Sequence, residues 1–385
     1  MSARLHALHA AGQSLWLDYI DRTMLSNGDL ARRIRDDALT GMTSNPTIFE
    51  KALADGVAYD AQLSTMDASL PVKTAFEMLA ATDVRDACDA FRPVYDTTKG
   101  VDGYVSLEVS PELANDAEGT VAEAHRLWAL VGRPNLMIKV PGTPAGADAV
   151  RRLIGDGLNV NVTLLFALDA HARVIDAYIA GLESRVARGL AIDRVASVAS
   201  FFVSRVDSAI DKQLDAMATT SSDSDAIRDL RGHAAIANAK LAYQLFLRAF
   251  AGSRWTALAT RGAQVQRPLW ASTSTKNPAY RDVIYVEALI GPNTVNTLPP
   301  ATLEAFRDHG TVRQSVTTGL TESEHALDAL DAVGISMRTV TDTLLRDGLA
   351  SFGQSFVTLL AGLERKRAAL AATSPTPPGA AAVAH

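Results

Sequence analysis

Short apolar runs alternate with longer segments of helical period along most of the chain. The runs that we predict as strands span 14–20, 39–44, 103–109, 135–140, 158–166, 194–203, 267–273 and 294–298. Several of them are apolar on both faces, which is typical of strands in a parallel sheet covered by helices. The pattern therefore predicts repeated βα units with parallel pairing.

The segments between these runs predict amphipathic helices, for example over 29–39, 118–132 and 144–157. About eight βα units suggest closure into a (β/α)8 barrel, a TIM barrel, rather than an open sheet. We expect a single barrel domain over residues 1–372 and a disordered tail over 373–385, because the tail is rich in Pro and Ala and lacks large apolar side chains.

Three regions depart from an ideal barrel. Residues 71–99 predict an extra helix between the second and third strands, and 204–252 predict a long, mostly helical connection interrupted by the polar segment 218–225. The chain after Pro299 shows no strand pattern, so we expect helices packed on the barrel there.

Composition and charge narrow the class of protein. The 385 residues are 48% hydrophobic, with a formal net charge of −6, which fits an ordinary globular protein and favours no nucleic-acid partner. The chain has no apolar run of the ~20 residues that cross a membrane, and its start lacks the apolar stretch of a signal peptide. We expect a cytoplasmic protein with no membrane association.

The single cysteine, Cys88, excludes an intrachain disulfide, and its helical setting favours a buried thiol over a nucleophile. The eight histidines all lie outside the predicted strands, and no nucleotide-binding, zinc-binding or calcium-binding motif is found in the sequence. We therefore expect no metal and no cofactor.

Polar side chains interrupt the apolar strands near their carboxyl ends, where barrel enzymes place catalysis. They come from seven of the eight predicted strands and comprise Asp18, Asn45, Glu108, Lys139, Asn161 with Thr163, Ser200 with Arg205, and Ser272, Ser274 and Lys276. In a closed barrel these side chains meet at one mouth, so we expect one pocket.

Lys139 carries the only charge in the run from Leu136 to Val140. Desolvation of an ammonium favours the neutral amine, which attacks carbonyl carbons. The alternative is a strand-end lysine whose ammonium reaches solvent. Gly142 and Gly146 in the following loop permit close approach of a ligand to the backbone, which favours a site.

Asp18 and Glu108 are carboxylates in otherwise apolar strands. Each is either a hydrogen-bonding anchor or, beside a Schiff-base lysine, a proton-transfer group. Asn45 is either a turn residue or a substrate ligand. Asn161 and Thr163 share one strand face, and their partner is either a substrate hydroxyl or a neighbouring strand.

Arg205 follows the sixth strand and Lys276 the seventh, where barrels commonly bind phosphate. A guanidinium binds phosphate through two parallel hydrogen bonds, and an ammonium binds it as a point charge. Each residue is alternatively a solvated surface cation.

At these residues the sequence resembles the transaldolases, a class I aldolase-like barrel family. The matching stretches, in chain order, are LWLDYIDR, GMTSNPTIF, GYVSLEVSP, NLMIKVPGT, LNVNVTLLF and SVASFFVSRV. The resemblance implies a transferase of the pentose phosphate pathway acting on sugar phosphates. Such an enzyme moves a dihydroxyacetone unit between sedoheptulose 7-phosphate or fructose 6-phosphate and glyceraldehyde 3-phosphate or erythrose 4-phosphate.

The resemblance also implies residue roles. Lys139 would form the Schiff base, Asp18 would act on the donor C4 hydroxyl, and Glu108 would act through a water; we group Thr163 with these catalytic residues. The residues expected to bind substrate are Asn45 and Asn161 at donor hydroxyls, Ser200 and Arg205 at the phosphate, and Phe202, Ser272, Ser274 and Lys276 around them.

The chain departs from the better-known transaldolases after the seventh strand. Where they carry an arginine after a Ser-Phe pair, this sequence reads WASTSTKNP, and we take Lys276 as the replacement cation. The long C-terminal helical region, with Trp16 and Trp270, resembles the bacterial branch that is also found fused to phosphoglucose isomerase.

Two other functions stay open. The nearer is a fructose 6-phosphate aldolase, which releases free dihydroxyacetone; such enzymes carry glutamine at the position of Glu108 and tyrosine at that of Phe202. The more distant is a non-catalytic barrel that binds sugar phosphates. The sequence is compatible with a monomer and with a homodimer.

Overall fold

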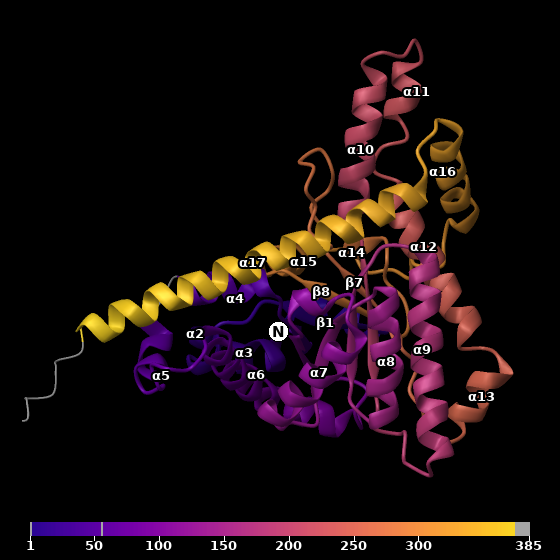
Figure 1. The fold of residues 1–385 in the computed structure, drawn as a ribbon. Helices are drawn as coiled ribbons and strands as arrows, with labels where there is room; N and C mark the ends of the chain where they lie inside the picture. Colours follow the sequence, from indigo (N-terminus) through magenta and orange to yellow (C-terminus); the bar gives the residue numbers. More distant parts are fainter. Residues whose placement is uncertain (1, 55–56, 374–385) are drawn as a thin grey trace, which may run out of the picture.

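The computed structural model describes residues 2–54 and 57–373, and its centre is a closed barrel of parallel strands in chain order (Figure 1). The strands are β1 (Gln13–Asp18), β2 (Leu39–Thr43), β3 (Tyr104–Glu108), β4 (Leu136–Pro141), β5 (Val160–Leu165), β6 (Ser197–Phe202), β7 (Arg267–Ala271) and β8 (Thr294–Leu298). β1 pairs with both β2 and β8, which closes the ring. The predicted (β/α)8 fold is confirmed, and each predicted run overlaps one strand.

Helices surround the barrel. In the described part of the chain they are α1 (Ala3–Ala10), α2 (Arg22–Ser26), α3 (Asp29–Asp36), α4 (Pro46–Ala54), α5 (Asp60–Ser64), α6 (Val72–Thr97), α7 (Ala117–Val131), α8 (Pro144–Asp156), α9 (Leu168–Ala187), α10 (Ser204–Ala218), α11 (Ser224–Arg228), α12 (Ala234–Ala249), α13 (Ser253–Ala259), α14 (Ile284–Glu287), α15 (Pro300–His309), α16 (Leu320–Ala332) and α17 (Met337–Thr373), with short 3₁₀ turns at Val57–Tyr59 and Pro111–Leu113. The extra helix near 71–99, the helical connection after β6 and the C-terminal helices are therefore present as predicted.

Several element boundaries differ from the sequence prediction by a few residues, and left-handed backbone conformations occur at two of the elements concerned. The helix predicted over 29–39 ends at Asp36, since Ala38 has φ 53° and Leu39 begins β2. The strand predicted over 158–166 is shorter, and its pairing with β6 shifts next to Leu164, which has φ 57°. Apart from Thr373, which ends α17, the predicted tail lies outside the described residues.

The amino-terminal end of the barrel is filled by packed and hydrogen-bonded side chains. The Trp16 indole lies so close to Gly41 that a Cβ atom on Gly41 would be 2.5 Å from the ring. The same indole donates a hydrogen bond to Asp102 at 2.7 Å, and Arg267 lies 3.5 Å from that carboxylate and donates to Ser14 at 2.6 Å. Side chains therefore fill the amino-terminal end of the barrel, and we expect the functional site at its carboxyl-terminal end.

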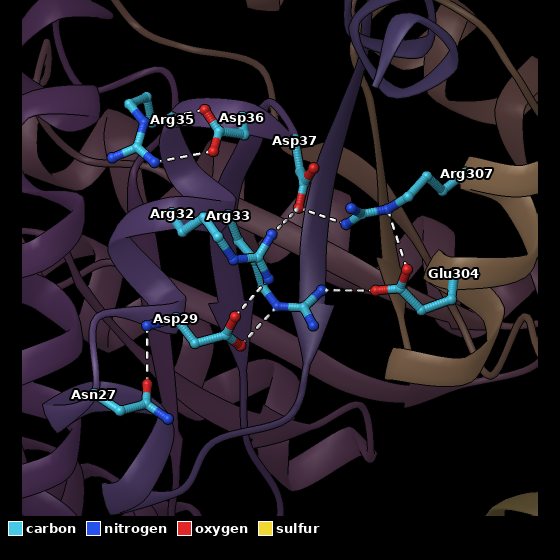
Figure 2. Close-up of polar contacts among 9 residues, drawn as sticks. All are labelled: Asn27, Asp29, Arg32, Arg33, Arg35, Asp36, Asp37, Glu304 and Arg307. Atoms are coloured by element: carbon cyan, nitrogen blue, oxygen red, sulfur yellow. Dashed lines mark hydrogen bonds and ion pairs between the residues drawn. The ribbon is translucent and has the colours of Figure 1, made fainter. Parts of the chain in front are cut away.

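An ion-pair network joins the helices on either side of the seam between β1 and β8 (Figure 2). On α3, Arg33 pairs with Asp29 at 2.9 Å and reaches Glu304 of α15 at 3.1 Å. Arg307 of α15 pairs with Asp37, at the end of α3, at 2.5 Å, and the Asp37 side chain is only 2% exposed. The network thus connects α3, which follows β1, to α15, which follows β8.

The longest helix, α17, runs across the carboxyl-terminal end of the barrel and is drawn in yellow in Figure 1. It packs on α4, α6 and α10 and contacts β5. Near its middle, Gly348 faces Leu164, and an added Cβ would be 3.1 Å from the leucine side chain. Toward its end, Arg367 donates to the carbonyl groups of Leu70 at 2.8 Å and Ala68 at 2.7 Å. The last turns of α17 are therefore hydrogen-bonded to the segment that precedes α6.

Candidate functional site

A cavity of about 300 Å³ lies at the carboxyl ends of the strands. Side chains from strand ends and their loops line it: Asp18, Thr43, Asn45, Lys139, Thr163, Ser200, Phe202, Arg205, Ala271, Ser272, Ser274, Lys276, Thr297 and Pro299. Helix α4 adds Thr47, Ile48 and Lys51, and α17 adds Phe352. The structure therefore brings together every predicted site residue except Glu108 and Asn161, which lie just behind the cavity wall.

Lys139 stands near the end of β4, and the residue is 5% exposed. Its Nζ lies 3.2 Å from Glu108 Oε2 and donates to the Ser44 carbonyl oxygen at 3.2 Å. The Phe352 ring lies on another side, with its centroid 5.7 Å from Nζ. The Lys139 amine is thus largely shielded from bulk water and lies at the cavity, so Lys139 is not a strand-end lysine whose ammonium reaches solvent.

The two predicted carboxyls flank this amine from β1 and β3. Burial raises the pKa of Asp18, while Lys139, a hydrogen bond from Thr43 at 2.7 Å and Arg205 act against that rise. Burial also raises the pKa of Glu108, again opposed by Lys139. A carboxyl whose pKa is raised toward neutrality can both give and take a proton, which suits acid–base work.

Asn161 lies below the cavity, fully buried, with its amide fixed from both sides. The Ser200 hydroxyl donates to its Oδ1 at 2.7 Å, and its Nδ2 donates to Ser106 at 3.0 Å. Thr163, two residues after Asn161 on β5, lines the cavity. Its buried hydroxyl has no hydrogen-bond partner in the described chain. A buried hydroxyl without a partner is costly, so Thr163 is suited to a ligand in the cavity.

Asn45 is a turn residue, one of the alternatives that its sequence position left open, and it also lies at the cavity. Its Oδ1 accepts a hydrogen bond from the Ile48 backbone N–H at 3.0 Å, which caps α4. The residue also borders the cavity, beside the Ser44 carbonyl that accepts from Lys139. The turn that begins α4 therefore fixes Asn45 next to the amine.

Two cations, Arg205 and Lys276, line the opposite part of the cavity. Arg205 begins α10, with its guanidinium 5.3 Å from the centroid of the Phe202 ring, and burial lowers its pKa. Lys276 donates to Ser274 at 2.7 Å, and burial together with Arg205 lowers its pKa. No carboxylate in the described chain forms an ion pair with either cation, so this end of the cavity is suited to an anion.

Eight further cavity residues are absent from the sequence predictions: Thr43, Thr47, Ile48, Lys51, Ala271, Thr297, Pro299 and Phe352. Thr43 and Thr297 are polar residues at the ends of β2 and β8, so the rule used for the other strands would have found them. Thr297 brings the eighth strand into the site. Lys51 and Phe352 lie on helices, where no local pattern distinguishes a cavity residue from a surface or core residue.

The described residues give no sign of a metal centre or a membrane span. No cluster of three or more His, Cys, Asp and Glu side chains in 2–54 and 57–373 is placed to hold a metal ion. No helix in the same ranges is long and apolar enough to cross a bilayer. Cys88 is buried in α6, and burial raises the pKa of its thiol, as expected for a structural cysteine.

Comparison with known sequences decides the family. A sequence model described as "Transaldolase/Fructose-6-phosphate aldolase" matches residues 15–363. The chain belongs to this family. The match runs from β1 into α17 and so includes the whole barrel and the segment of α17 that carries Phe352.

Relatives in the transaldolase/fructose-6-phosphate aldolase family are similar over nearly their full lengths. The protein named transaldolase from Trichodesmium erythraeum is 47% identical over 92% of this chain and 95% of its own. The transaldolase of Thermobifida fusca is 48% identical over 96% of this chain and 100% of its own. That of Frankia alni is 48% identical over 94% and 96%.

Proposed function

We propose that this protein is a transaldolase of the pentose phosphate pathway, acting in the cytoplasm on sugar phosphates. It transfers a dihydroxyacetone unit from sedoheptulose 7-phosphate or fructose 6-phosphate to glyceraldehyde 3-phosphate or erythrose 4-phosphate. The observation that carries the proposal is the buried Lys139 amine, 3.2 Å from Glu108 and in the same cavity as Asp18. Full-length similarity to proteins named transaldolase supports it.

The reaction begins when the neutral amine of Lys139 attacks the donor's C2 carbonyl carbon. Glu108 supplies a proton to the carbinolamine hydroxyl, which leaves as water, and a protonated imine remains as an electron sink for the next step. Asp18 takes the proton from the C4 hydroxyl, the C3–C4 bond breaks, and its electron pair moves into the imine. The aldehyde product leaves, and a three-carbon enamine remains on Lys139.

The second half of the reaction reverses these steps on a new aldehyde. The enamine carbon attacks the acceptor's C1, and Asp18 returns its proton to the new hydroxyl. Water then hydrolyses the imine and frees Lys139. Glu108, 3.2 Å from the Lys139 amine, assists the water-dependent steps.

Substrate orientation follows from the polar residues around Lys139. Asn45 and Thr163 line the cavity and bind the hydroxyls of the dihydroxyacetone unit, while Asn161, behind the wall, acts through its hydrogen bond with Ser200. At the other end, the phosphate binds to Arg205 and Lys276, with Ser272 and Ser274 supplying hydroxyls and Ser200 fixing the Asn161 amide. This places the reacting C3–C4 bond between the amine and Asp18.

Transfer, rather than release, is favoured by the apolar Phe202 in the cavity wall. Release of free dihydroxyacetone requires a proton on the enamine carbon, and a phenyl ring has none to give. The related fructose 6-phosphate aldolases carry tyrosine at this position. The family name covers both activities, so the fate of the enamine is the property that must be measured.

A covalent adduct tests the proposal. Borohydride reduction in the presence of fructose 6-phosphate should add a dihydroxyacetone-sized mass to the peptide that contains Lys139, detected by mass spectrometry. Lys139→Ala should lose the adduct and nearly all turnover, whereas Lys276→Ala should keep the adduct at saturating substrate. An adduct on Lys276, or none at all, contradicts the assignment; the second result favours a binding protein.

The acceptor decides between transferase and aldolase. With fructose 6-phosphate as donor, erythrose 4-phosphate should increase product formation by orders of magnitude over free dihydroxyacetone release. Equal release with and without acceptor would show an aldolase.

A further inference from the structure

The loop after β7 places Lys276 at the cavity but has little regular structure of its own. Between Ala271, where β7 ends, and Ile284, where α14 begins, the chain forms only turns and bends. Lys276 makes one hydrogen bond, to Ser274 in the same loop at 2.7 Å. Its position relative to Arg205 therefore depends on what fastens the loop to the rest of the molecule.

Two tyrosine–aspartate hydrogen bonds fasten the loop, and α14 directly after it, to α10. The Tyr280 hydroxyl donates to Asp211 at 2.7 Å, and the Tyr285 hydroxyl donates to Asp207 at 2.8 Å. The two aspartates are four residues apart and so lie on one face of α10, the helix that begins beside Arg205. The loop that carries one cation is thus hydrogen-bonded to the helix that carries the other.

The segment from Gly232 to Ala235 also binds these two carboxylates, through its backbone N–H groups. The second carboxylate oxygen of Asp211, Oδ1, accepts a hydrogen bond from the Gly232 backbone N–H at 3.0 Å. Oδ1 of Asp207 likewise accepts one from the Ala235 backbone N–H at 2.7 Å. Gly232 has φ 76°, and a Cβ there would be 2.8 Å from the Tyr280 ring. A residue with a side chain would be strained and would push the ring away, so glycine is needed for this contact.

Such fastening is needed because the two cations repel each other when no anion is bound. Arg205 and Lys276 line one cavity, and neither pairs with a carboxylate in the described chain. A groove of about 300 Å³ on the other side of Lys276, bordered by Asp207, Asp211 and Tyr280, leaves the loop room to move outward. The hydrogen bonds from the tyrosines oppose that movement.

We propose that Asp207, Asp211, Tyr280 and Tyr285 form a positioning clamp that holds Lys276 opposite Arg205 and so sets the affinity for the substrate phosphate. The clamp touches neither the substrate nor Lys139. It rests on the proposed phosphate role of the two cations, and it should act on phosphate binding while leaving the covalent steps unchanged.

Removal of one clamp hydroxyl tests the inference. Tyr280→Phe should raise the inhibition constant of inorganic phosphate and the KM for fructose 6-phosphate, each by roughly threefold to tenfold, the effect of one net hydrogen bond. kcat at saturating substrate and the Lys139 adduct should stay as in the wild type. Gly232→Ala, which displaces the Tyr280 ring by a different route, should shift both constants in the same direction.

Tyr243→Phe is the matched control, because its hydroxyl donates to the Pro292 carbonyl at 2.9 Å, away from the clamp. It should leave both constants unchanged. In a Lys276→Ala background, Tyr280→Phe should have no further effect on phosphate inhibition, because the two changes act through the same contact.

The outcomes separate the clamp from the function on which it rests. If Lys276→Ala weakens phosphate inhibition and neither Tyr280→Phe nor Gly232→Ala does, the clamp is wrong and the phosphate site stands. Full additivity of Tyr280→Phe with Lys276→Ala also contradicts the clamp. If Lys276→Ala itself leaves phosphate inhibition unchanged, both assignments are wrong, while the Lys139 adduct still reports the catalytic proposal.

Discussion

Burial favours the neutral forms of several ionisable side chains, among them Asp18, Glu108 and His171. It raises the pKa values of Asp18 and Glu108 in the cavity, where Lys139 and other polar partners act against it. It lowers the pKa of His171, to about 4 from an ordinary value of 6.5. The carboxyls have polar partners and a use in proton transfer, but neither ring nitrogen of His171 has a hydrogen-bond partner in the described chain.

His171 should therefore make the protein sensitive to acid. Between pH 6.5 and about 4 the unfolded chain binds a proton at this ring and the folded protein does not. Stability from His171 is present above pH 6.5 and is lost as pH falls toward 4, by about 1.4 kcal/mol per pH unit. Between pH 7 and pH 5 the free energy of unfolding, measured with urea, should fall by about 2 kcal/mol less in His171→Leu than in the wild type.

The exposed His325 provides the control for this measurement. His325→Leu should leave the difference in unfolding free energy between the two pH values as in the wild type. An unchanged pH dependence in His171→Leu would show that the buried ring is protonated in the folded protein or does not limit stability.

Single residues were predictable from the sequence where charge or polarity interrupted a strand. Asp18 and Lys139 stood out because burial of an ionisable group among apolar neighbours costs free energy, which indicates a function for the group. Phe352 could not be found in this way, because an aromatic residue in a helix is ordinary for a core. Its contact with Lys139 arises only from the path of α17 across the barrel.

At the scale of elements, the ion pairs between α3 and α15 should stabilise the barrel seam (Figure 2). Arg307→Ala removes the nearest partner of Asp37, whose side chain is 2% exposed. An unpaired buried carboxylate is costly, so the free energy of unfolding should fall by about 2–3 kcal/mol, with Arg32 at 3.8 Å as partial compensation. Urea unfolding at pH 7 measures this change.

The pair between Arg35 and Asp36 is the matched comparison, since the Arg35 side chain is 67% exposed. Arg35→Ala should change the free energy of unfolding by less than about 1 kcal/mol, because exposed ion pairs contribute little. Equal effects of the two substitutions would contradict a special role for the buried carboxylate.

The strands were predictable because a parallel sheet covered by helices must be apolar on both faces. Their details were less so: β5 spans only Val160–Leu165 of the predicted run 158–166, and the left-handed residue Leu164 shifts its pairing with β6. Hydrophobic pattern does not reveal such a conformation, since leucine rarely adopts it. The helices after Pro299 were expected, but nothing in their pattern indicated that one of them crosses the mouth.

At the scale of the whole molecule, α17 joins the end of the described chain to the catalytic cavity. Phe352 lies over the Lys139 amine and takes space that water would otherwise occupy. Phe352→Ala should therefore admit water to the enamine and imine on Lys139. We expect dihydroxyacetone release without acceptor to rise on the order of tenfold and transfer to fall, as water exclusion is lost.

Val357, 61% exposed on the same helix, provides the control. Val357→Ala should leave the ratio of release to transfer unchanged, which an enzymatic assay of dihydroxyacetone can measure for both variants. An unchanged ratio in Phe352→Ala would show that α17 does not shield the intermediate.

Barrel closure has a consequence for synthesis on the ribosome. Asp18 lies on β1, which emerges among the first segments of the nascent chain, but β1 must pair with β8, and Phe352 follows still later. Asp18 therefore leaves the exit tunnel long before the partners that bury it. Until β8 has emerged, the nascent barrel exposes the unpaired edge of β1, and until α17 has emerged the cavity is incomplete. Chaperones should therefore bind most before β8 emerges, and activity should still be absent before α17 emerges.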